Sequence, residues 1–375
     1  MTSMRPSQEI IRRNVPDLLR FADGSPVQQA EQWPRRRAEL LNMLQDTVFG
    51  HAPAAPEVVT AEVTACKDPE AAGKAIREDI RVSFDTPKGP FSFPFTLVRP
   101  KKTEKPPVFL LINFENTVPN KYYPMEELID NGYAVAQLYY EDVTEDNRPP
   151  KGETGFADPS VCFTEGLAVC YPRDPETGWG KIGMWAWAAS RVMDVLCQRD
   201  DLDLNRVAVV GHSRLGKTAL WCSAQDERFS MAVSNDSGCG GAALFREKEG
   251  EKIEFMKHRF PFWFCGRYST YANREQDLPT DQHALLAMTA PRGLLVNSAS
   301  LDAWADPVSE YLSTRAASPV FELLGKTGLQ APDRLPEAEE AFLDGTLAYA
   351  MRDGTHYFSR TDWHRIMAYR EKHGL

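Results

Sequence analysis

The amino-acid sequence predicts an α/β fold in which helices cover both faces of a doubly wound, mostly parallel sheet, a three-layer sandwich. Three features predict it. Short, nearly continuous apolar runs recur along the 375 residues, as strands buried on both faces require. Helical patterns separate most of these runs, which is the order of βαβ units. One run leads through a tight turn with a serine into a helix.

Residues 1–60 are expected to form an irregular N-terminal arm with one helix that packs on the main domain. Apolar residues at helical spacing between 31 and 50, followed by Gly50, predict that helix. Residues 61–375 are expected to form one α/β domain. An inserted lid is expected near residues 240–285.

Strands are predicted along the rest of the chain. Two alternating segments, 80–84 and 91–98, flank the turn sequence DTPKGP and predict an antiparallel hairpin at the edge of the sheet. Apolar runs predict further strands at 106–114, after Gly132 through Tyr139, and at 207–210, 231–234, 293–298 and 347–352. Helices are predicted at 124–131, 182–199 and from 215 onward, and a polar loop is expected to fill about 143–180.

The composition limits the classes of partner. With 53 acidic and 43 basic residues, the formal net charge is −10, which argues against nucleic acid or an anionic membrane as the main partner. Glycine-rich dinucleotide motifs and the HExxH zinc motif do not occur in the sequence, so we expect neither a cofactor nor a metal.

The cysteines and the N-terminus bear on the compartment. The sequence has seven cysteines, an odd number, and it contains no CxxC pair. A reducing compartment is the simplest interpretation. The first residues contain no apolar stretch typical of a signal peptide, so a cytoplasmic location is expected.

The serine in the tight turn is Ser213, in the sequence RVAVVGHSRLGKTALW. A strand, a sharp turn, a serine and a helix are the context of the nucleophile elbow of α/β-hydrolases. Gly211 gives the turn room, and Gly216 allows the helix to approach the strand closely. The alternative is that Ser213 is an ordinary helix N-cap, which uses the same residue type.

A nucleophilic serine needs a base, and the base needs an orienting acid. In α/β-hydrolases these follow in the order serine, acid, histidine. His356 comes just after the last apolar run and a glycine turn, where such a histidine is expected. Two acids compete: Asp236 follows the strand after the serine helix, and Asp302 follows the next one. Either can also be a turn or capping residue.

Six segments carry a resemblance to a known family: GHSRLGKTALW, NDSGCGGAAL, FPFWFCGRY, LPTDQH, LDAWADP and GTHY, in this order. Together they resemble the glucuronoyl esterases, carbohydrate esterase family 15 of the α/β-hydrolase superfamily. The hallmark of this family is Gly-x-Ser-Arg-x-Gly-Lys, and residues 211–217 match it throughout. The resemblance extends from about residue 17 to the C-terminus, with the densest matches between 206 and 306.

The resemblance implies a role for each matching residue. Ser213 corresponds to the nucleophile and His356 to the general base. Arg214 corresponds to an arginine that helps to form the oxyanion hole. The family's acid occurs at either of the positions held by Asp236 and Asp302. The first is often glutamate in relatives, and because aspartate is shorter, we favour Asp302.

The same resemblance implies a sugar site and a reaction. Lys217 and Trp304 correspond to residues that hold the uronate ring, and Glu251 to a partner of sugar hydroxyls. The implied reaction is hydrolysis of esters of glucuronic acid or its 4-O-methyl form, as in glucuronoxylan or derived oligosaccharides, through an acyl-enzyme. The alternatives are an acetylxylan-type deacetylase or another carboxylesterase, and a non-catalytic carbohydrate-binding relative. Relatives are generally secreted, so a cytoplasmic protein would act on imported uronate oligosaccharides.

Overall fold

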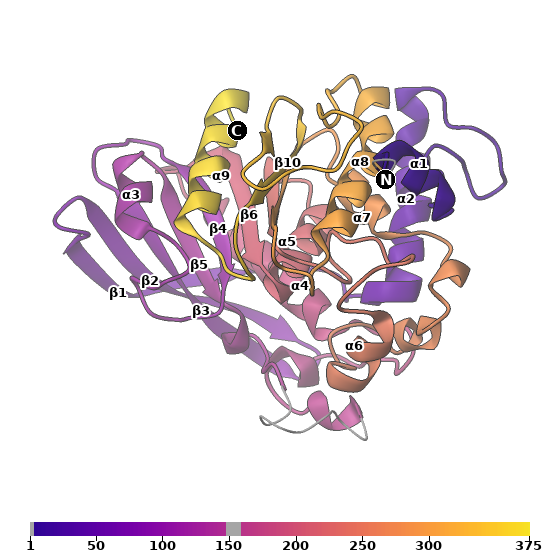
Figure 1. Ribbon diagram of the computed structural model, residues 1–375. Coiled ribbons are helices and arrows are strands. Elements are labelled where there is room, and N and C mark those ends of the chain that lie inside the picture. Colours follow the sequence, from indigo (N-terminus) through magenta and orange to yellow (C-terminus); the bar gives the residue numbers. More distant parts are fainter. Residues whose placement is uncertain (1–3, 148–158) are drawn as a thin grey trace.

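The computed structural model describes residues 4–147 and 159–375 and contains a twisted, largely parallel sheet between two helical layers (Figure 1). The described strands form a ten-stranded sheet in the order β1-β2-β3-β5-β4-β6-β7-β8-β10-β9. The strands are β1 (Thr60–Glu70), β2 (Ala75–Thr86), β3 (Gly89–Pro100), β4 (Pro107–Asn113), β5 (Ala134–Tyr139), β6 (Asp203–His212), β7 (Met231–Asn235), β8 (Gly293–Ala299), β9 (Ala341–Phe342) and β10 (Leu347–Arg352). The predicted α/β fold with a mostly parallel sheet in a three-layer sandwich is therefore confirmed (Figure 1).

Strands β5, β4, β6, β7, β8 and β10 run parallel, so their carboxyl ends meet at one edge of the sheet. Along β6, Val207 and Val209 join one core and Ala208 and Val210 join the other, because successive side chains point to opposite faces. This two-sided burial explains why these strands read as continuous apolar runs in the sequence.

Helices cover the two faces unequally. The larger core contains side chains of α2 (Trp33–Leu44), α4 (Lys181–Leu196), α5 (Arg214–Gln225), α7 (Gln282–Ala287) and α8 (Pro307–Leu323). The smaller core contains side chains of α3 (Met125–Asp130) and α9 (Arg360–His373). Both cores include side chains of β6, β7, β8 and β10, so these strands are buried on both faces of the sheet.

The predicted edge hairpin is longer than expected, and it does not lie at the edge. Strands β2 and β3 pair antiparallel over twelve residues each, but β1 pairs with the outer side of β2 and is the true edge strand. The sequence of β1 shows only a short apolar alternation, at Ala61, Val63 and Ala65, and nearly all of its residues are exposed on both faces. The period-2 signal that identifies strands is therefore weak in β1.

The N-terminal arm differs from the expectation of one helix. The predicted helix is α2, and it ends in one π-helical turn before Gly50. A second helix, α1 (Pro6–Arg12), precedes it; it has seven residues and contributes little apolar surface, so its periodicity was not recognisable. Residues Leu40, Leu44 and Val48 are buried in the larger core.

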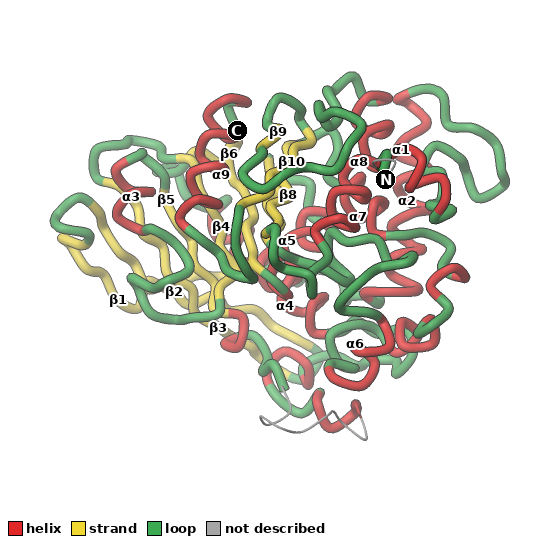
Figure 2. The backbone as a smooth tube through the Cα atoms, in the orientation of Figure 1, coloured by secondary structure: helices red, strands yellow, loops and turns green. Residues whose placement is uncertain are grey.

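The segment 240–285, expected to be a lid, contains α6 (Ile253–Arg259), α7 and short 3-10 turns joined by loops (Figure 2). The expected polar loop at 143–180 lies partly outside the described residues; its described part contains two 3-10 turns at Pro159–Cys162 and Gly166–Val169. The helices of the described chain are all too short or too polar to cross a membrane.

Candidate active site

Ser213 lies at the sharp turn between β6 and α5. Its backbone has φ 56° and ψ −128°, a conformation that side-chain-bearing residues rarely adopt. A Cβ at Gly211 would lie 2.0 Å from the carbonyl oxygen of Leu215, so glycine is required where the chain turns. In helix α5, whose residues are all described, Ser213 makes no side-chain capping bond. The geometry is that of a nucleophile elbow and not of an ordinary N-cap.

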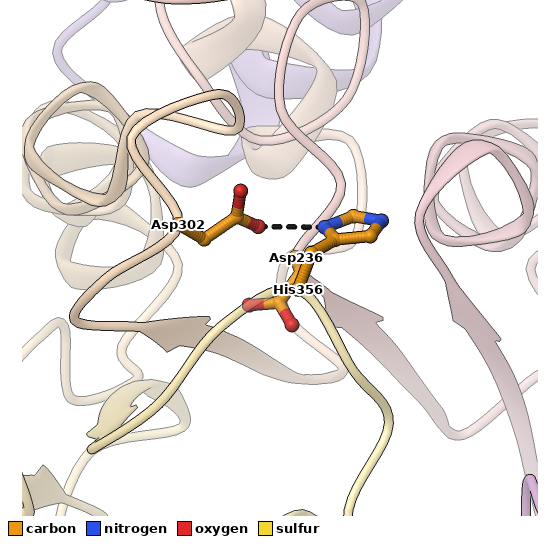
Figure 3. A group of neighbouring side chains, drawn as sticks. All are labelled: Asp236, Asp302 and His356. Carbon is orange, nitrogen blue, oxygen red and sulfur yellow. Dashed lines mark hydrogen bonds and ion pairs between the residues drawn. The ribbon is translucent and has the colours of Figure 1, made fainter.

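His356 and Asp302 form a hydrogen-bonded pair at the carboxyl edge of the sheet. Asp302 follows β8 and His356 follows β10, and Nδ1 of His356 lies 2.6 Å from Oδ2 of Asp302. Figure 3 shows that the other ring nitrogen, Nε2, lies on the side of the ring away from Asp302. Burial by itself would raise the pKa of Asp302, but the hydrogen bond and charge of His356 outweigh it and lower that pKa. The carboxylate thus stays ionised and orients the imidazole.

Asp236 lies beside this pair but contacts a different partner. It follows β7, is buried, and its Oδ2 lies 3.2 Å from Nη2 of Arg352. Burial raises the pKa of Asp236 well above its ordinary value, the negative charge of Glu310 adds to this, and Arg352 opposes it. Both predicted acids are therefore near His356, and the hydrogen bond to the ring goes to Asp302.

Asp236, Asp302 and His356 offer three potential metal-ligand atoms within 4.8 Å of one another (Figure 3). The charges around them do not favour a metal. Nδ1 of His356 is already bonded to Asp302, and the guanidinium of Arg352 supplies the positive charge beside Asp236. The donor set is better described as a histidine–carboxylate pair with a neighbouring ion pair.

The histidine next to the serine does not take part in this pair. His212 is buried, and its Nδ1 lies 2.7 Å from Oδ1 of Asn235. Desolvation, followed by the nearby charge of His356, lowers the pKa of His212 to about 3. The ring is neutral, and its centroid lies 4.6 Å from that of the His356 ring, against which it packs. His283 is also buried and contacts the carbonyl of Pro16.

Arg214, the first residue of α5, is held in place from three sides. Its Nη1 donates to Oδ2 of Asp146, and the guanidinium lies over the rings of Trp263 and Phe114, at 4.8 and 5.2 Å from their centroids. Nε1 of Trp263 donates to the other oxygen of Asp146 at 2.8 Å. The first-turn N–H groups of a helix have no partner within the helix, so the N-terminus of α5 can bind an anion. The guanidinium of Arg214 adds a fixed positive charge to that site.

A pocket of about 310 Å³ opens in front of Ser213. At its base, Nζ of Lys217 forms a buried ion pair with Oε2 of Glu251 at 3.0 Å. Trp304, with about half of its surface exposed, stands at the mouth with its ring 4.7 Å from that of Phe255. The lining residues are Ser213, Arg214, Lys217, Asp236, Ser237, Gly238, Glu251, Phe255, Phe260, Trp263, Trp304, Ala305 and His356.

The structure thus brings all eight predicted site residues to one place, with Asp302 just behind His356. Sequence reasoning missed Asp146 and Arg352, which contact the site from distant segments, and it gave no role to Phe255 and Phe260, although Phe260 begins the FPFWFCGRY segment. Trp263 was assigned to the core or the lid, and it also forms a wall of the pocket. A larger surface depression of about 750 Å³ lies elsewhere, between α3 and the β1–β2 turn.

Known proteins with similar sequences and structures share one family. Residues 167–325 match the family model described as glucuronyl esterase, fungi. A carbohydrate esterase, MZ0003, from an unknown prokaryotic organism is 33% identical over 97% of this chain and 90% of its own length. The 4-O-methyl-glucuronoyl methylesterase of Schizophyllum commune is 29% identical over 83% of this chain and 74% of its own.

The solved glucuronoyl esterase from Solibacter usitatus is 33% identical, covers 96% of this chain and 97% of its own, and superposes with a TM-score of 0.84. The similarity to these esterases in sequence and in structure extends over nearly the whole chain. The same molecule contains a nucleophile elbow, a histidine–aspartate pair and a polar pocket. The chain therefore belongs to the glucuronoyl esterases, carbohydrate esterase family 15, and is a carboxylic ester hydrolase.

Proposed function

We propose that this esterase hydrolyses esters of glucuronic acid, including its 4-O-methyl form, with Ser213 as the nucleophile. The observation that carries the proposal is the pocket itself. It is lined by Ser213 and His356, and it presents Arg214, Lys217, Glu251 and the Trp304 ring to whatever acyl group enters. A small acetyl group would make no use of these side chains, whereas a uronate ring carries hydroxyls that can hydrogen-bond to Lys217 and Glu251.

In the proposed mechanism, Nε2 of His356 removes the hydroxyl proton as Oγ of Ser213 attacks the ester carbonyl carbon. Negative charge then develops on the carbonyl oxygen, where the helix N-terminus and Arg214 stabilise it. When the C–O bond to the alcohol breaks, His356 returns its proton to the departing oxygen. A water molecule, deprotonated by the same nitrogen, attacks the acyl-enzyme, the bond between the acyl carbon and Oγ of Ser213 breaks, and His356 returns the proton to Oγ as the uronic acid leaves.

Asp302 keeps His356 in the tautomer that this sequence needs, because a proton held on Nδ1 leaves Nε2 free to act as a base. Lys217 and Glu251, paired in the empty pocket, are proposed to exchange part of their mutual contact for the sugar hydroxyls. Trp304 is proposed to offer its flat face to the ring. The first-turn position of Lys217, one helical turn after Ser213, fixes how far the sugar extends from the reacting carbon.

A panel of esters tests the proposal. Methyl and benzyl glucuronate, with and without the 4-O-methyl group, are compared with acetylated xylose and 4-nitrophenyl acetate. We expect kcat/KM to be highest for the uronate esters and to vanish in Ser213→Ala. Equal or greater activity on the acetylated sugar would favour the deacetylase, and unchanged turnover in Ser213→Ala would reject the assigned nucleophile.

A further inference from the structure

Arg352, the last residue of β10, is a buried cation just before the loop that carries His356. Its Nη2 donates to the backbone carbonyls of Thr355, at 2.6 Å, and of Tyr357. These are the residues immediately before and after His356. One guanidinium nitrogen therefore holds the main chain on both sides of the histidine.

We propose that Arg352 is a positioning residue that fixes the loop 353–357 and so aims His356 at Ser213, with Asp236 as its counter-ion. The inference rests on the proposed function in that it takes Ser213 and His356 as the nucleophile and base. It assigns to Asp236 an indirect role, through Arg352, in place of a direct contact with the imidazole.

The chemistry of the guanidinium suits this task. Arginine presents five N–H donors in a rigid plane, whereas lysine offers three donors at a single point. In Arg352 the Nε group donates to Asp362 at 2.9 Å while Nη2 reaches Asp236 and the two carbonyls. A lysine at this position cannot bridge the carboxylates and the loop at the same time.

The loop is shaped to fit the arginine. Gly354 has φ +129°, and a Cβ there would lie 2.7 Å from Nη1 of Arg352, so the backbone passes directly against the guanidinium. The same loop is tied to the loop of Asp302, because Leu301 N–H donates to the Gly354 carbonyl at 2.9 Å. The loops that carry His356 and Asp302 are thus fixed relative to each other.

Two carboxylates from other elements hold the arginine. Asp236 comes from the end of β7, and Asp362 lies in the first turn of α9, where it forms a capping box with Ser359. Both are buried with Arg352, so each charge depends on the others for compensation. Oδ2 of Asp236 is 4.0 Å from Nδ1 of His212 and 3.2 Å from Arg352, which makes the arginine its main partner.

The test compares Arg352→Lys with Arg370→Lys. Arg370 is a matched control because it is equally buried and donates to backbone carbonyls, those of Val108 and Arg206, away from the His356 loop. A fluorophosphonate probe labels the reactive serine without needing a sugar pocket. Its end point gives the active fraction, and its rate reports how well the base activates the serine.

For Arg352→Lys we expect the labelling rate, and kcat per labelled site on methyl glucuronate, to fall about 10- to 100-fold, as for a displaced catalytic group. KM should change by less than about 3-fold, because Arg352 is not among the residues that line the pocket. Arg370→Lys should lower the unfolding midpoint and leave both rates per site unchanged. Wild-type rates per labelled site in Arg352→Lys would overturn the proposal.

A double-mutant cycle tests the role of Asp236, with each rate expressed per labelled site so that unfolded protein is not counted. Arg352→Met combined with Asp236→Asn removes both charges and leaves Asp362 with its capping bonds. If Asp236 acts through Arg352, Asp236→Asn lowers kcat in the wild-type background and has little further effect beside Arg352→Met. If Asp236→Asn lowers kcat equally in both backgrounds, Asp236 acts on His356 directly, and the assignment of Asp236 as the counter-ion through which Arg352 is held is overturned. A wild-type enzyme that reacts with the probe but cleaves no glucuronate ester would reject the proposed function alone.

Discussion

Asp302 and His356 come from loops after two different strands, β8 and β10. Their side chains join the two loops through a contact of 2.6 Å between Oδ2 of Asp302 and Nδ1 of His356. Asp302→Asn would keep the shape of the side chain but allow the wrong imidazole tautomer. We expect kcat on methyl glucuronate to fall by about 10³- to 10⁴-fold with little change in KM. Asp236→Asn should cost far less. Steady-state kinetics of the two variants decide the matter, and the reverse order would show that Asp236 is the triad acid.

The ion pair of Lys217 and Glu251 is predicted to select the sugar. Replacing both, Lys217→Met with Glu251→Gln, avoids leaving one buried charge alone. We expect KM for methyl glucuronate to rise about 10- to 100-fold, the equivalent of one hydrogen bond to a charged group. Turnover of 4-nitrophenyl acetate, which carries no sugar, serves as the control. A parallel loss on both substrates would mean that the pair supports the fold and not the substrate.

Asp146 is predicted to act through Arg214, which it holds beside the carbonyl site. Asp146→Asn keeps an acceptor for Trp263 but removes the charge that pairs with the guanidinium. We expect kcat to fall about 10- to 100-fold while KM stays nearly constant, because a donor on the developing oxyanion acts in the transition state. If KM rises and kcat does not change, Arg214 instead binds the ground state of the substrate.

Glu310 in α8 is predicted to make stability depend on pH. Burial raises the pKa of Glu310 from its ordinary 4.5 to about 7, against the hydrogen bonds from Ser298 and Gly238. Because the folded-state pKa is the higher one, the folded protein is favoured below pH 4.5 and loses stability as the pH rises towards 7. Relative to Glu310→Gln, the wild type should lose about 3 kcal/mol of unfolding free energy over this range. Urea unfolding at several pH values measures it, and a constant difference would contradict the prediction.

The strands that surround the site could be predicted because they are buried on both faces and their sequences are almost entirely apolar. The elbow could be predicted because Gly211, Ser213 and Gly216 lie within six residues of one another, in one strand–turn–helix segment. In contrast, β1 is exposed on both faces, and its short alternation of Ala61, Val63 and Ala65 distinguishes it only weakly from a loop. Local sequence thus identifies strands that are buried on both faces and tight turns with special residues, but it does not identify a strand that is held only by backbone pairing.

The choice between Asp236 and Asp302 shows the limit for the site. Both follow strands at the same edge of the sheet, and both lie within reach of His356. What separates them is Arg352, whose guanidinium engages Asp236 from a strand more than a hundred residues later in the chain. A partner of that kind follows from the assembled sheet, and no spacing in the sequence reveals it.

The backbone of Ser213, with φ 56° and ψ −128°, has a consequence for how this position is maintained. A residue with a Cβ in such a conformation costs of order 1–3 kcal/mol, a cost that glycine largely escapes. Ser213→Gly is therefore expected to raise the unfolding midpoint while abolishing hydrolysis. A protein selected for folding alone would drift to glycine here, so the serine records selection for turnover against stability.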